Sequence, residues 1–78
     1  MGKTIDRMRA NPKADWTIDD IEKACREVGL VCIRPSRGSH WKIGEVTGGR
    51  RYTIPARRPI KPQYIAEFLK FLNEIGRA

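Results

Sequence analysis

The residues best suited to chemistry lie in the stretch Gly38-Ser39-His40-Trp41-Lys42-Ile43, which contains the only histidine of the chain. A glycine lets the backbone approach a ligand closely, and the residues after it alternate as they do in a half-buried strand. Successive side chains of a strand point to opposite faces, so His40 and Lys42 should share one face and Trp41 and Ile43 the other. The pattern therefore predicts an imidazole, which titrates near neutral pH, beside a cation on one surface.

Basic residues are concentrated around this stretch. Residues 34–61 hold eight of them against one acid, Glu45, and eight minus one equals the net charge of +7 for the whole chain. The flanking residues are therefore neutral on balance. A localised cationic field favours a polyanionic partner, and nucleic acid is the commonest polyanion.

Metal-assisted cleavage of a nucleic acid would need carboxylates to hold the ions, and the basic segment offers only Glu45. We therefore expect neither a metal nor another cofactor. Metal-free cleavage of RNA needs a group that titrates near neutrality, together with cations that stabilise the charge on the phosphorus centre. His40 fits the first role and Lys42 the second. The second proton-transfer group could be Tyr52, Lys42 or water.

Other residues of the segment are expected to hold the RNA. Ser39 or the backbone after Gly38 would donate hydrogen bonds to a phosphate oxygen, and arginines would hold the sugar–phosphate backbone. The expected RNA-binding residues are Gly38, Ser39, Lys42, Arg37, Arg51, Arg57, Arg58 and Lys61. Trp41 and Tyr52 could stack on bases, but strand alternation assigns both to the core face.

The spacing of apolar residues predicts the helices and strands that must position these residues. Thr17 is typical of an N-cap, and Ile18, Ile21 and Cys25 recur at helical spacing, which predicts a helix over residues 17–28. Short apolar or alternating runs predict strands over 30–33, 39–43 and 50–55, and Pro62 begins a second helix that ends near Gly76. The order implies an α+β fold in which both helices cover one face of a three-stranded antiparallel sheet. His40, Lys42, Arg51 and Thr53 should then lie on the open face.

Seventy-eight residues permit one small domain, which we expect over 15–78 after an N-terminal segment, 1–14, that forms a short helix or an arm. Cys25 and Cys32 are expected to be free, buried thiols. No apolar run is long enough to span a membrane, and no secretory signal is evident, so we expect a cytoplasmic protein with no membrane partner.

Short motifs of the chain resemble the HicA family, the toxins of bacterial type II toxin–antitoxin pairs. They are Gly38-Ser39-His40, the strand end Thr53-Ile54-Pro55, and the run over 55–62 that leads into a helix. The resemblance covers about residues 15 to 75. It implies a fold like that of double-stranded-RNA-binding domains, an mRNA interferase activity with His40 as the catalytic residue, and a HicB-type antitoxin as partner. The hairpin residues, 44–49, differ from those of many family members, and the chain lacks a second nearby histidine that some relatives have.

The main alternative is an RNA-binding module that uses the same basic face without cleaving. A subunit that recognises an acidic protein would explain the charge but not the Gly-Ser-His arrangement. DNA binding is compatible with the charge, yet the second helix lacks the polar surface of a recognition helix.

Overall fold

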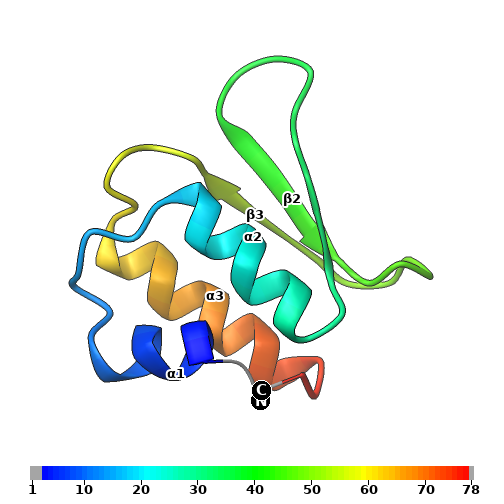
Figure 1. Cartoon of the computed structure of the whole chain (residues 1–78). Helices are drawn as coiled ribbons and strands as arrows, with labels where there is room; N and C mark the ends of the chain where they lie inside the picture. The colour runs from blue at the N-terminus through cyan, green and yellow to red at the C-terminus, as the bar shows by residue number, and fades with distance from the viewer. Residues whose placement is uncertain (1–2, 78) are drawn as a thin grey trace.

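The computed structural model describes residues 3–77 and consists of helices on one side of a three-stranded antiparallel sheet (Figure 1). The elements in chain order are α1 (Lys3–Ala10), α2 (Ile18–Glu27), β1 (Val31–Ile33), β2 (His40–Gly44), β3 (Arg51–Pro55) and α3 (Pro62–Glu74). The predicted α+β class, the three strands and the two longer helices are confirmed, with bounds that differ by one or two residues.

Helix α2 begins where its capping residues predict. The Asp20 carboxylate accepts a hydrogen bond of 2.9 Å from the backbone N–H of Thr17, which pairs a group that the first helical turn leaves free. The helix ends before Gly29, whose φ of +74° is the left-handed conformation that favours glycine. Ile18, Ile21 and Cys25 are buried along one side of α2.

The strands pair in the order β1-β2-β3. Cys32, Ile43 and Tyr52 lie abreast across the three strands, and the next row along the sheet consists of Ile33, Lys42 and Thr53. Because neighbouring rows point to opposite faces, the first row lies on the helix-covered face and the second on the open face. Ile43 is fully buried, whereas Lys42 and Thr53 are exposed.

The core lies between the sheet and the helices. Helix α2 packs against β1 and α3 packs against β3, so the two helices cover the same face (Figure 1). Ile54 from β3 and Ile65, Phe68 and Leu72 from α3 are fully buried there. Among residues 3–77, no helix covers the opposite face of the sheet.

A third helix, α1, is one of the two forms expected for the N-terminal segment. It packs against α2 and α3 and buries Ile5 and Met8. Its start is held to α2 by Glu27, whose carboxylate accepts hydrogen bonds from the Thr4 hydroxyl at 2.7 Å and from the Thr4 backbone N–H at 3.1 Å. Two apolar residues three positions apart were too weak a pattern to predict this packing. The described part of the N-terminal segment thus forms a packed helix and not an arm.

Candidate nucleic-acid interface

The open face of the sheet carries His40 and Lys42 side by side along β2. Both side chains are exposed, while Ile43 is buried and Trp41 half-buried on the other face. In the pairing with β3, His40 lies opposite Pro55 and Lys42 opposite Thr53. The structure therefore places the imidazole and the ammonium group on one surface, which agrees with the alternation of the sequence.

A shallow cavity of about 380 Å³ lies where β1, β2 and the loop over 34–39 meet. It is lined by Ile33, Arg34, Pro35, Ser36, Arg37, His40 and Lys42. Three cations and one imidazole thus surround a space large enough for a phosphate group and part of a sugar. We call it the histidine cavity. Arg34 was counted in the basic segment but was not among the predicted site residues, because nothing in its spacing showed that the loop would fold back onto the strand.

The loop over 34–39 arches beyond the end of the sheet (Figure 1). Gly38 has φ of +76°, so a glycine is required there by the turn. Beyond it, the backbone N–H of Ala56 donates a hydrogen bond of 2.6 Å to the Ser39 carbonyl, which ties the loop to the end of β3. Gly38 and Ser39 therefore serve to place His40 at the start of β2, and Ser39 is half-buried.

Arg51 lies at the other end of the open face, opposite Gly44. A Cβ atom built on Gly44 would stand 3.0 Å from Cγ of Arg51, so the arginine stem crosses the face over this glycine. His40 is four strand positions from Gly44, which corresponds to about 13 Å along the strand. The open face thus carries cations at both ends of β2.

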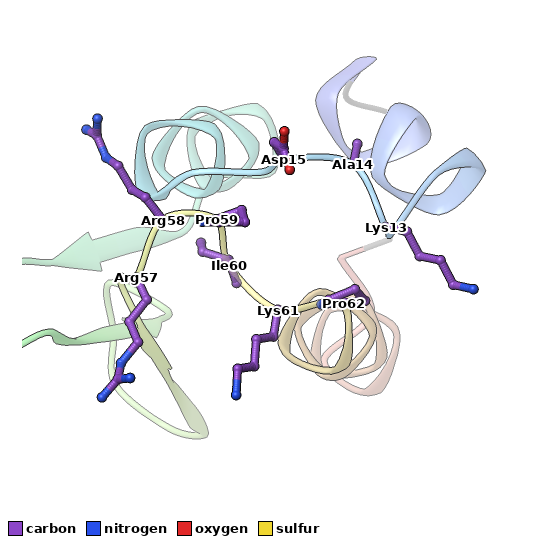
Figure 2. Close-up of a pocket in the computed structure, with 9 residues that line it drawn as sticks. All are labelled: Lys13, Ala14, Asp15, Arg57, Arg58, Pro59, Ile60, Lys61 and Pro62. Carbon is purple, nitrogen blue, oxygen red and sulfur yellow. The ribbon is translucent and has the colours of Figure 1, made fainter.

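Arg57, Arg58 and Lys61 occupy a different region. Together with Lys13, Ala14 and Asp15 they line a second cavity of about 390 Å³, in which Arg57 and Lys61 extend to one side and Arg58 to the other (Figure 2). The backbone N–H of Ile60 donates a hydrogen bond of 2.9 Å to the Trp16 carbonyl and so fixes this loop beside the start of α2. These three predicted residues do not line the histidine cavity.

Tyr52, one of the options for the second proton-transfer group, is on the wrong face. It stacks on Phe71 with 5.8 Å between ring centroids, and its hydroxyl donates a hydrogen bond of 3.2 Å to the Tyr64 carbonyl. Burial, with a further contribution from Glu67, raises the pKa of the Tyr52 phenol above its ordinary value. Lys42 and water remain as options. Within residues 3–77, the His40 imidazole has no hydrogen-bond partner.

The cysteines form no disulfide in the described part of the chain. Both thiols are free, with Cys25 buried and Cys32 half-buried. Over residues 3–77 there is no cluster of three His, Cys, Asp or Glu side chains that could hold a metal ion. The helices of the same residues include none that is long and apolar enough to cross a membrane.

Comparison of the chain with models of protein families, with curated proteins and with solved structures gives no match.

Proposed function

We propose that this protein is a metal-independent endoribonuclease that cleaves mRNA at the histidine cavity. The observation that carries the proposal is the placement of His40 among Arg34, Arg37 and Lys42 on an uncovered sheet face. An imidazole can transfer a proton near neutral pH, and the cations can bind a phosphodiester and stabilise its transition state.

In the proposed reaction the RNA supplies the nucleophile. The 2′-oxygen forms a bond to the neighbouring phosphorus and the bond from phosphorus to the 5′-oxygen breaks, which leaves a 2′,3′-cyclic phosphate and a 5′-hydroxyl. One proton leaves the 2′-hydroxyl and one is added to the 5′-oxygen. His40 carries out one of these transfers, and Lys42 or water the other. Arg34 and Arg37 hold the nonbridging phosphate oxygens, where negative charge increases.

The resemblance to HicA toxins supports a proposal for the biological role. The segment from α2 to α3 runs helix, three antiparallel strands, helix, which is the order expected of a fold like that of double-stranded-RNA-binding domains. We extend the proposal to a toxin of a type II toxin–antitoxin pair, inhibited by a HicB-type antitoxin. An acidic surface of such a partner would compete with RNA for the same cationic face.

The test uses the purified protein and its His40→Ala variant with single-stranded RNA in EDTA. The unsubstituted protein should yield cyclic or 3′-phosphate ends paired with 5′-hydroxyl ends, and the variant should yield none. An RNA with a single unmodified 2′-hydroxyl among 2′-O-methyl nucleotides should be cut only there. Lys70→Ala, on the exposed side of α3, serves as the matched control and should cleave normally. Cleavage that needs magnesium, or that survives in His40→Ala, would contradict the mechanism.

A second candidate is an RNA-binding module that does not cleave. It is favoured by the lack of any hydrogen bond that orients the His40 imidazole within the described residues, since catalytic histidines are usually held by a further group. Intact RNA, bound equally by the protein and by His40→Ala, would identify this function.

A further inference from the structure

A further cavity lies beside the histidine cavity, on the other side of the loop over 34–39. Its volume is about 430 Å³, and the residues that matter for its chemistry are Arg34, Arg37, Trp41 and Arg58. Arg34 and Arg37 line both this cavity and the histidine cavity, so the loop is their common wall. We call the further cavity the tryptophan cavity. Trp41 is expected on the core face, but only part of its side-chain surface is buried there.

The two tryptophans differ in a way that points to a ligand. Trp16 is 9% exposed, and its indole N–H donates a hydrogen bond of 2.8 Å to the Asn11 carbonyl. Trp41 is half-buried, and within residues 3–77 no group accepts a hydrogen bond from its indole N–H. No buried polar side-chain atom of the described residues lacks a partner, so this N–H reaches solvent. Trp41 thus offers part of an aromatic ring and a free donor to the cavity.

The charges around Trp41 fit an anion. Arg58 has one acidic neighbour, Asp19, at 4.0 Å, and both side chains are more than 70% exposed. An exposed pair at this distance is weak, so the guanidinium can turn to another partner at little cost. Arg37 is exposed on the loop and has no ion pair among residues 3–77. An aromatic surface between cations is the arrangement by which proteins bind single-stranded nucleic acid.

We propose that the tryptophan cavity binds one nucleotide of the RNA strand, next in sequence to the phosphate in the histidine cavity. The base stacks on Trp41, and the phosphate on the side of this nucleotide away from the histidine cavity binds Arg58. Arg37, which lines both cavities, lies between this phosphate and the one that is cleaved. The strand then passes around the loop, whose arginines contact it on both sides. This inference rests on the proposed RNA substrate and adds to it a subsite that selects unpaired RNA, because a base within a duplex cannot stack on a protein side chain.

Intrinsic fluorescence can test the subsite directly. In a Trp16→Phe background Trp41 is the sole tryptophan, since the chain has two, and excitation at a wavelength that tyrosine does not absorb selects its emission. The protein is titrated with a 2′-O-methyl oligoribonucleotide, which cannot be cleaved, and binding is followed in parallel by the anisotropy of a dye on the oligonucleotide. We expect saturable quenching of Trp41 at the same concentrations as the anisotropy change, and protection of Trp41 from acrylamide.

Variants give the second readout. Loss of one stacked base weakens binding roughly 5- to 150-fold, so Trp41→Leu should fall in this range and Trp41→Phe should retain most of the affinity. Circular dichroism and thermal melting show whether each variant is folded. The fluorescence titration keeps Trp41 unsubstituted, so it tests the subsite even if a Trp41 variant does not fold.

The outcomes separate the two proposals. Binding seen by anisotropy, without quenching or protection of Trp41, would overturn the subsite and leave the RNA substrate standing. Absence of any binding would overturn both. Equal affinity for a duplex and a single strand of the same sequence would also overturn the subsite, because only the single strand can supply a base to Trp41.

Discussion

Replacing Arg37 and Lys42 together by glutamine is expected to halve the contribution of the open face to the salt dependence of RNA binding. The two side chains line the histidine cavity and lie on the surface that we assign to the phosphates. Glutamine keeps most of the side-chain volume and removes the charge. The change therefore tests the electrostatic part of the interface separately from its shape.

The magnitude follows from the number of cations on the open face. Four are placed there, namely Arg34, Arg37, Lys42 and Arg51. If each neutralises one phosphate of a single strand, the open face contributes roughly −2.8 to the slope of log K against log salt, and loss of two cations brings this contribution to about −1.4. Between about 50 and 200 mM salt, the contribution of the open face to affinity should fall roughly 50-fold in the unsubstituted protein and roughly 7-fold in the variant.

The assay is fluorescence anisotropy with an uncleavable 2′-O-methyl oligoribonucleotide at several salt concentrations in EDTA. The control variant, Lys23→Gln with Lys70→Gln, removes the same charge from exposed positions on α2 and α3. Its slope should stay close to that of the unsubstituted protein. Equal slopes for the two double variants would refute the reasoning, because net charge and not the open face would then govern binding.

Three further predictions concern packing and pH. Phe68→Ala removes a fully buried ring and should lower the free energy of unfolding by about 3–5 kcal/mol, measured by urea denaturation. Gly44→Val places a side chain against Cγ of Arg51 and should displace the arginine. RNA affinity should therefore fall by the same factor in Gly44→Val and in Arg51→Gln, while the circular dichroism spectrum of each stays unchanged. Hydrogen bonds from Thr4 lower the pKa of Glu27 below its ordinary 4.5, so their stabilisation is complete above that pH and is lost as the pH falls through the lower, folded-state pKa. Melting temperatures in Glu27→Gln should therefore depend less on pH in the acidic range.

Much of the fold could be predicted from local patterns. The cap at Thr17, the glycine at position 29 and the proline at position 62 lie within one or two residues of the observed helix ends, because capping and backbone conformation depend on neighbours in sequence. The packing of α1 could not be predicted, since it depends on apolar surface that α2 and α3 present only after they fold.

The candidate site could likewise be predicted only in part. Local sequence is enough to predict that His40 and Lys42 share a face and that positive charge gathers around them, because the period of a strand is two and the basic residues can be located along the chain. The three-dimensional fold was needed to show that Arg34 and Arg37 join His40 in one cavity, and that Arg57, Arg58 and Lys61 lie apart from it. It also decided that Trp41 keeps part of its ring at the surface. These outcomes depend on where a loop folds in three dimensions, and that is set by contacts between segments far apart in the chain, such as the hydrogen bond from Ala56 to Ser39.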